Sequence, residues 1–208
     1  MKLPPRTVER LSKYRRLLSK YYQTEGAHIF SHDLARMLNL TPVQVRRDLM
    51  LVGLTGNHRK GYSIQKLIAL IGNTIDSTEG HNIAIFGIGN LGRAVTAFIR
   101  KNQTKMNIVA AFDIDPEKVN NQIEEVPCFH ISEITRKVRE LSVEIAILTV
   151  SPDAATDITN ILVKANVKGI LNFTSVHLDV PSDVYLKNYD IITSLEEIGF
   201  YIKDSGKA

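Results

Sequence analysis

Apolar residues recur every three or four positions over residues 7–22, and this spacing predicts an amphipathic helix near the start of the chain. The apolar stripe consists of Val8, Leu11, Tyr14, Leu17 or Leu18, and Tyr21. Gly26 interrupts the pattern. Ser31 then has the character of an N-cap residue, so a short second helix carrying Leu34 and Leu38 is expected after it.

The third predicted helix has the strongest start signals in the chain. Thr41 is a suitable N-cap residue, Pro42 suits the first helical position, and Gln44 could close a capping box. The apolar stripe of this helix consists of Val45, Leu49 and Val52, and Gly53 ends it. Residues 54–62 contain turn-forming glycines and predict a hairpin or wing. Three helices and a wing are the elements of a winged helix-turn-helix domain.

A fourth helix is expected after Ser63, and residues 73–80 read as a polar linker. Beyond the linker, apolar runs alternate with helical patterns. The predicted strands are residues 82–87, 108–113, 144–150 and 169–173, and the predicted helices are residues 91–100, 131–139 and 154–165. This alternation predicts an α/β fold with a doubly wound parallel sheet. A short amphipathic helix over residues 194–203 has no obvious place in that sheet.

Length and charge divide the chain in the same way. The 208 residues suffice for two domains, and we expect a DNA-binding domain at 1–78, a Rossmann domain at 79–193 and a C-terminal helix and tail at 194–208. Residues 1–78 contain 13 Lys and Arg against 5 Asp and Glu, a net charge of +8, whereas residues 79–208 contain 13 against 17, a net of −4. A basic first third indicates a polyanionic partner for that part alone, unless the charges cluster by chance.

The composition also excludes several classes of protein. No run of 18 apolar residues is present, so no membrane-spanning helix is expected. Cys128 is the only cysteine; it cannot form an internal disulfide, and it lies far from any cluster that suggests a metal site. A cytoplasmic location without membrane or metal partners follows by elimination.

The motif with the clearest chemistry is the run Gly87, Ile88, Gly89, Asn90, Leu91, Gly92. It follows an apolar strand and opens a helix, which is the setting of a dinucleotide-binding loop. The first glycine permits a tight turn, the second lets the backbone approach a pyrophosphate, and the third lets helix and strand pack closely. The N-terminus of the helix adds free N–H groups for the phosphates.

An acid at the end of the second strand completes this pattern. Asp113 follows Gly92 by 21 residues, where a carboxylate can accept both ribose hydroxyls of the adenosine and repel a 2′-phosphate. NAD(H) is therefore expected in preference to NADP(H). Lys118 follows nearby, but it stands beyond Pro116 and is not expected to offset the acid.

The third predicted helix carries the candidate groups for DNA. Gln44, Arg46 and Arg47 are polar, and glutamine can recognise adenine whereas arginine can recognise guanine or phosphate in the major groove. His58, Arg59 and Lys60 stand at the wing tip, where cations can contact phosphates or enter a minor groove. The alternative interpretation is an ordinary solvated face of a small helical domain.

Two other functions remain open at this point. A small NAD-dependent oxidoreductase would need a proton-transfer group beside the nicotinamide, and no persuasive acid–base set is present. A scaffold that binds coenzyme A or a nucleotide, without a role at DNA, is disfavoured by Asp113. Neither a catalytic residue nor a metal ligand is therefore assigned.

Several segments, taken together, resemble the Rex family of redox-sensing transcriptional repressors. The resemblance spans nearly the whole chain: it includes Arg10, Tyr14 and Arg16, the run 45–49 (VRRDL), the loop 87–92 (GIGNLG), and the runs 112–116 (FDIDP), 146–150 (AILTV) and 168–173 (KGILNF). By this resemblance Thr149, Val150 and Asn172 are further cofactor-binding candidates.

The resemblance also implies how such a protein works. It implies a homodimer whose C-terminal helix is swapped into the partner subunit. It further implies binding of operator DNA when NADH is low and release of the DNA when NADH binds. Arg16 and Asp190 match an arginine and an aspartate that form a state-dependent ion pair in the family.

Overall fold

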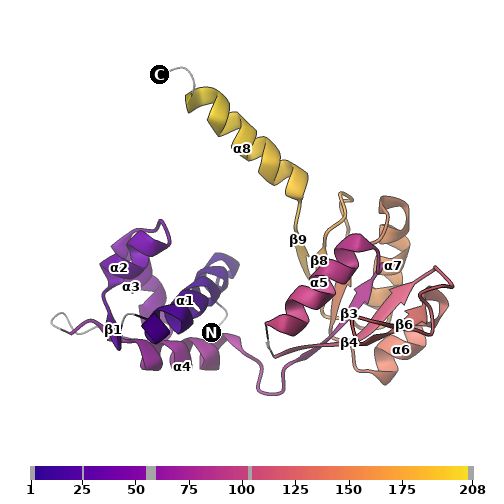
Figure 1. Cartoon of the computed structure of the whole chain (residues 1–208), viewed down its shortest axis with the longest axis horizontal. Coiled ribbons are helices and arrows are strands. Elements are labelled where there is room, and N and C mark those ends of the chain that lie inside the picture. Colours follow the sequence, from indigo (N-terminus) through magenta and orange to yellow (C-terminus); the bar gives the residue numbers. More distant parts are fainter. Residues whose placement is uncertain (1–2, 25, 55–59, 103–104, 206–208) are drawn as a thin grey trace. The chain divides into compact units, whose positions relative to one another are not determined.

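The computed structural model describes residues 3–24, 26–54, 60–102 and 105–205. The chain forms two compact units, Met1–Thr78 and Glu79–Ala208 (Figure 1). Each unit has its own buried apolar core.

The first unit is a small helical domain with one two-stranded sheet. Its elements are α1 (Pro5–Thr24), β1 (His28–Ile29), α2 (Ser31–Met37), α3 (Pro42–Leu51), β2 (Tyr62–Ser63) and α4 (Ile64–Ile75). Strands β1 and β2 pair antiparallel, with Ile29 opposite Tyr62. The predicted stripes bury Leu11 and Leu18 of α1, Val45 of α3 and Leu67 of α4 in a single core. The helices exist because each has one apolar face to bury.

The start of α3 follows the prediction at its N-cap and first turn. Thr41 is the N-cap residue, its Oγ1 accepts a hydrogen bond from the Gln44 N–H at 3.2 Å, and Pro42 occupies the first turn. The Gln44 side chain was also predicted to close a capping box; its Nε2 donates to Asp48 Oδ1 at 3.0 Å, and a return hydrogen bond from its Oε1 stays a prediction. The second helix differs slightly from the prediction, since Phe30 rather than Ser31 is at its N-cap.

The second unit is a seven-stranded, mostly parallel sheet with helices. The elements are β3 (His81–Phe86), α5 (Asn90–Lys101), β4 (Met106–Asp113), β5 (Gln122–Ile123), β6 (Val126–His130), η1 (Ile131–Glu133), α6 (Ile134–Glu140), β7 (Ile145–Leu148), α7 (Pro152–Lys164), β8 (Gly169–Asn172), β9 (Tyr185–Asn188) and α8 (Ile191–Ser205). The strand order is β5-β6-β4-β3-β7-β8-β9, and only the β5–β6 pair is antiparallel. The predicted Rossmann fold is therefore confirmed.

The strand order reverses between β3 and β7, which run side by side in parallel register. Open α/β sheets bind their ligands at such a switch point, beyond the carboxyl ends of the strands. Buried apolar side chains fill both faces of the sheet here, including Ile85 and Phe86 of β3 and Leu148 of β7. The core therefore fixes the two loops that follow β3 and β7 in relation to each other.

The last helix differs from the rest of the second unit. Helix α8 begins at Ile191, three residues before the predicted start, and each side chain from Ile191 to Lys203 is exposed. Its large apolar side chains include Ile192, Ile198 and Tyr201, which are 63%, 55% and 64% exposed. No helix in the described ranges has the length and apolar character needed to cross a membrane.

Candidate functional site

The glycine-rich loop joins β3 to α5 at the switch point. Gly87 has a φ of +88°, a left-handed conformation that favours glycine. Its N–H donates to the carbonyl of Phe112 at 2.8 Å, which ties the loop to the end of β4. A Cβ at Gly87 would lie 2.8 Å from the Thr149 carbonyl oxygen, so neither the backbone conformation nor the space permits a side chain.

The other two glycines have different reasons to be glycine. A Cβ at Gly92 would lie 2.2 Å from the carbonyl oxygen of Gly87, so close packing of the helix on its own loop demands glycine. Gly89 is the N-cap of α5, with an ordinary φ of −73°, and a Cβ there would meet no heavy atom within 4 Å. The protein itself therefore does not need a glycine at position 89, whereas a phosphate approaching the helix N-terminus would.

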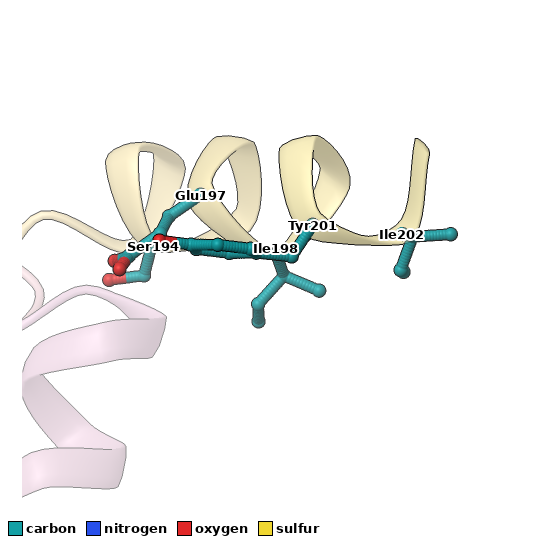
Figure 2. Close-up of a pocket in the computed structure, with 5 residues that line it drawn as sticks. All are labelled: Ser194, Glu197, Ile198, Tyr201 and Ile202. Carbon is teal, nitrogen blue, oxygen red and sulfur yellow. The ribbon is translucent and has the colours of Figure 1, made fainter. Parts of the chain in front are cut away.

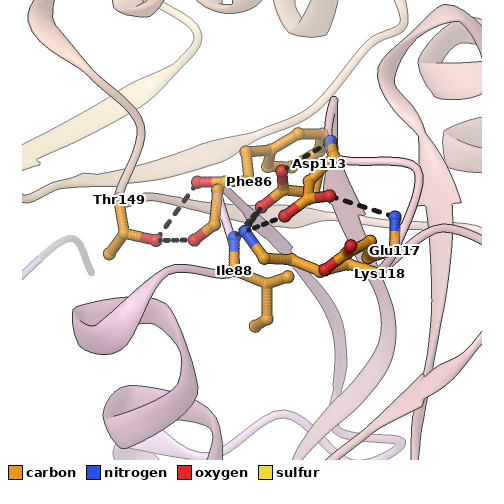
Figure 3. Close-up of polar contacts among 8 residues, drawn as sticks. Phe86, Ile88, Asp113, Glu117, Lys118 and Thr149 are labelled. Carbon is orange, nitrogen blue, oxygen red and sulfur yellow. Dashed lines mark hydrogen bonds and ion pairs between the residues drawn. The ribbon is translucent and has the colours of Figure 1, made fainter.

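Thr149, in the loop between β7 and α7, supports this turn with its side chain. Thr149 Oγ1 lies 2.6 Å from the carbonyl oxygen of Gly87 and 3.1 Å from that of Phe86, and donates its hydroxyl proton toward them (Figure 3). Thr149 and Val150 are both partly buried. Thr149 is thus a support for the loop, and contact of Thr149 or Val150 with a cofactor stays a prediction.

Asp113 is held at the end of β4 by donors from three residues. Its Oδ2 accepts the Ile88 N–H at 2.9 Å and lies 3.3 Å from Lys118 Nζ, while Oδ1 accepts the Asp115 N–H at 3.0 Å (Figure 3). Burial alone would raise the pKa of Asp113, but the two backbone hydrogen bonds and Lys118 outweigh it and lower the pKa. The group is therefore an ionised acceptor at neutral pH.

These contacts change two details of the sequence-based prediction. A carboxylate has about four acceptor positions, and donors of the chain itself already use three of those on Asp113. One acceptor position therefore stays open on Asp113, so we now expect one ribose hydroxyl there rather than both. Lys118 was expected to stand apart from the acid, and this was wrong, because a turn places its ammonium against Asp113.

Asn172, another cofactor-binding candidate, is fully buried at the end of β8. Its Nδ2 donates to the Val176 carbonyl oxygen and to Asn188 Oδ1, both at 3.0 Å, and its Oδ1 accepts the Thr174 N–H at 2.9 Å. The side chain thus organises the loop after β8 and links it to β9. Its binding of a cofactor stays a prediction.

Of the candidate DNA-contacting residues, three lie on α3 and the others lie in the segment before β2. Arg46 and Arg47 are exposed, and Gln44 is partly buried. Lys60 is exposed just before β2, whereas His58 and Arg59 lie outside the described residues. Helices α2 and α3 follow each other in the chain as the two helices of a helix-turn-helix do, a motif whose second helix usually contacts the bases. Base contact by residues of α3 stays a prediction.

Helix α3 is held in place by a buried carboxylate that the sequence pattern did not predict. Asp48 is 1% exposed, and its carboxylate accepts from Arg10 Nε at 2.6 Å, Arg10 Nη2 at 2.8 Å and the Tyr14 hydroxyl at 2.7 Å. With Gln44 as the fourth donor, the acceptor positions of this carboxylate are filled. Burial alone would raise the pKa of Asp48, but the hydrogen bonds from Arg10 and Tyr14 lower it below its ordinary value.

The proposed ion-pair partners Arg16 and Asp190 lie in different units. Arg16 is exposed on α1. Asp190 caps α8: its Oδ1 accepts the N–H groups of Ile192 at 2.9 Å and Thr193 at 3.1 Å, and its Oδ2 accepts the Thr193 hydroxyl at 2.6 Å. The pairing of Asp190 with Arg16 stays a prediction.

No group of three or more His, Cys, Asp and Glu side chains in the described part of the chain is arranged to hold a metal ion. Cys128 is buried in β6, and burial raises the pKa of its thiol.

Both parts of the chain are similar to known protein families. A family model described as a putative DNA-binding protein N-terminus matches residues 2–49, and one described as a CoA binding domain matches residues 78–176. A redox-sensing transcriptional repressor Rex from Anoxybacillus flavithermus is 35% identical over 208 residues, covering 99% of this chain and 96% of its own.

Solved structures of a Rex-family repressor, RSP, are similar over the same length. RSP in complex with NAD⁺ and operator DNA has a TM-score of 0.90 and 26% identity, covering 99% of this chain and 95% of its own. RSP in complex with NADH has a TM-score of 0.87 and 26% identity, covering 99% and 97%. On the identity and coverage of these relatives, the chain belongs to the Rex family of redox-sensing transcriptional repressors.

Proposed function

We propose that this chain is a transcriptional repressor that binds operator DNA when NADH is low and releases it when NADH binds. The observation that carries the proposal is Gly89, which no contact with the described residues requires to be glycine. It lies at the N-cap of α5, in the loop whose Ile88 N–H binds Asp113. A dinucleotide with its pyrophosphate at the helix N-terminus and its adenosine ribose at Asp113 accounts for both features.

The DNA half of the proposal rests on α3. Arg46 and Arg47 are exposed on α3, and the buried Asp48 carboxylate fixes this helix against α1. The two cations are therefore attached to a well-ordered helix. Lys60 adds a third cation before β2, and the wing residues His58 and Arg59 remain candidates by sequence alone. The RSP complex that contains operator DNA also contains NAD⁺, whereas another RSP structure contains NADH. We propose that the present chain, too, binds operator DNA in the absence of NADH and not in its presence.

We further propose a homodimer in which α8 packs against the partner subunit. Ser194, Glu197, Ile198, Tyr201 and Ile202 line an open hollow along one side of α8 (Figure 2). A helix of 15 residues is marginal in water without packing. Burial of Ile198 and Tyr201 against a second copy would supply that packing, as a swapped helix does.

The switch requires two states that the ligands favour differently. A dimeric helix-turn-helix protein must hold its two recognition helices about 34–36 Å apart to reach successive major grooves. NADH binding in the Rossmann units would favour another spacing, and an ion pair between Arg16 and Asp190 would stabilise one of the two states. Because a repressor acts where DNA and the NADH pool occur together, we place the protein in the cytoplasm.

The test is a titration of DNA binding at fixed salt, since phosphate contacts make the affinity strongly salt-dependent. Duplexes selected from a randomised pool are titrated with the protein alone, with NADH, with NAD⁺ and with coenzyme A. We expect NADH to weaken binding by roughly 5- to 150-fold, the usual range for allosteric coupling, and coenzyme A to have no effect. Unchanged DNA affinity in saturating NADH would refute the sensor function, even if both ligands bind.

Asp190→Ala tests the ion pair in the same assay. If Arg16 pairs with Asp190 in one state only, Asp190→Ala and Arg16→Ala should change the NADH effect by the same factor, and the double variant should add nothing further. Since Asp190 also caps α8, Asp190→Asn is the matched control, because it keeps a capping oxygen and removes the charge.

A further inference from the structure

The segment after β4 folds back onto Asp113. The Asp115 N–H donates to Asp113 Oδ1 at 3.0 Å, the Glu117 N–H donates to Asp115 Oδ1 at 3.0 Å, and the Lys118 N–H donates to the Asp115 carbonyl oxygen at 3.0 Å. Asp113 and Asp115 thus each form a tight turn with the residues that follow them. This turn carries Lys118 past Pro116 and back to the carboxylate.

The Lys118 ammonium lies between two carboxylates. Its Nζ is 3.3 Å from Asp113 Oδ2 and 3.2 Å from Asp115 Oδ2, and the lysine side chain is 24% exposed (Figure 3). Burial alone would lower the pKa of Lys118, but the hydrogen bonds to Asp115 and Asp113 outweigh it and raise the pKa. The lysine is therefore a fixed cation, with part of its surface open to solvent, beside the acid expected to bind ribose.

A ribose 2′-hydroxyl and a 2′-phosphate would meet this pair differently. A hydroxyl both donates and accepts, so it matches a carboxylate acceptor beside an ammonium donor. A 2′-phosphate carries close to two negative charges and would meet two carboxylates that already neutralise the single cation. Without the Asp113 charge, the same ammonium becomes a point charge of the kind that binds phosphate.

We propose that Lys118 is the second determinant of dinucleotide selectivity: in the wild-type protein it binds the ribose 2′-oxygen together with Asp113, and it is also a latent 2′-phosphate site that the Asp113 carboxylate masks. The proposal rests on the proposed dinucleotide site. The spacing of Asp113 and Lys118 in the sequence does not predict their contact. The contact exists because the chain turns at Asp115.

The experiment is a cycle of variants in which calorimetry measures the affinities for both NADH and NADPH. Asp113→Asn keeps the shape of the side chain and removes its charge, and Lys118→Met removes the ammonium. We expect Asp113→Asn to gain affinity for NADPH by roughly 10- to 150-fold, the range of a charged hydrogen bond, and the double variant to lose that gain. Lys118→Met alone should weaken NADH binding and leave NADPH weak.

A matched control and a folding check accompany the cycle. Lys168→Met removes a lysine just before β8 that is also paired with a carboxylate, Asp183 at 3.2 Å, and it should change neither affinity. Circular dichroism confirms that each variant is folded, and Asp113→Ser replaces Asp113→Asn if the asparagine variant is not.

The possible outcomes separate this inference from the proposed function. If the wild-type protein binds neither dinucleotide, the proposed function fails and the inference fails with it. If the wild type binds NADH but removal of the Asp113 charge brings no gain for NADPH, or if that gain persists without Lys118, the inference alone is overturned.

Discussion

Alanine at Gly89 should separate ligand binding from folding. A Cβ at this position meets no heavy atom within 4 Å, and the φ of −73° suits any residue. Two small effects oppose each other, because alanine is a poorer N-cap residue than glycine but restricts the unfolded chain. The free energy of unfolding should therefore change by less than about 1 kcal/mol.

The same methyl group would occupy the space in which we place the pyrophosphate. A phosphate that backs away from the helix N-terminus loses one charge-assisted hydrogen bond or more, each of about 1.5–3 kcal/mol. NADH affinity should fall roughly 10- to 150-fold. Fluorescence titration with NADH measures the affinity, and thermal unfolding followed by circular dichroism measures the stability.

Gly92→Ala is the contrasting variant. Its Cβ would lie 2.2 Å from the Gly87 carbonyl oxygen, where ordinary contact begins at 3.4 Å, so the helix or the loop must move by at least 1.2 Å. Both stability and NADH affinity should fall, the stability by about 1–3 kcal/mol. Gly72→Ala is the control: it adds a methyl group in α4, away from the glycine-rich loop, where the Cβ would lie 3.5 Å from Asp76 Oδ2, an ordinary contact distance. If Gly89→Ala binds NADH as the wild type does, the proposed position of the pyrophosphate is wrong.

Asp48 and Ile198 allow the stability of the first unit and the role of α8 to be tested. Asp48→Ala leaves the Arg10 guanidinium, which is 20% exposed, and the Tyr14 hydroxyl without their acceptor. In urea unfolding, the free energy of unfolding should fall by roughly 2–4 kcal/mol. A decrease of less than about 1 kcal/mol would contradict this prediction. Because the pKa of Asp48 is lowered in the folded protein, its contribution is present above the ordinary value of 3.8 and is lost as the pH falls below it, so the difference between wild type and Asp48→Ala should shrink from pH 6 to pH 3. Ile198→Asp places a charge on the exposed apolar side of α8, and light scattering should show monomers, whereas an intact dimer would argue against the α8 interface.

The sequence predicts the sheet well because buried parallel strands are continuous apolar runs. Strands β3, β4, β7 and β8 each lie at such a run, and the loop after β3 is marked by its glycines. Three strands escape prediction for physical reasons. Strand β9 lies at the edge of the sheet with three of its four side chains exposed, β5 has only two residues, and β6 contains Pro127.

The site contacts were harder to foresee because they depend on partners far apart in sequence. Asp48 pairs with Arg10 across 38 positions, and an aspartate in a helix is usually solvated. One signal was available: Asp48 is three residues after Val45 and next to Leu49, so it lies on the apolar stripe rather than opposite to it. The contact between Lys118 and Asp113 had no comparable signal, because it requires the turn at Asp115.

The hydrogen bond from Ile88 to Asp113 has a consequence for what such a sensor measures. The Ile88 side chain is fully buried while its N–H donates to the Asp113 carboxylate, so the glycine-rich loop and the end of β4 are held together, and there we place the adenosine diphosphate half of the dinucleotide. That half of the molecule is identical in NADH and NAD⁺, and its binding energy cancels when the two compete. Contacts with the adenosine diphosphate half would therefore set how much total dinucleotide saturates the protein. The response to the ratio of NADH to NAD⁺ would arise only from contacts with the nicotinamide ring.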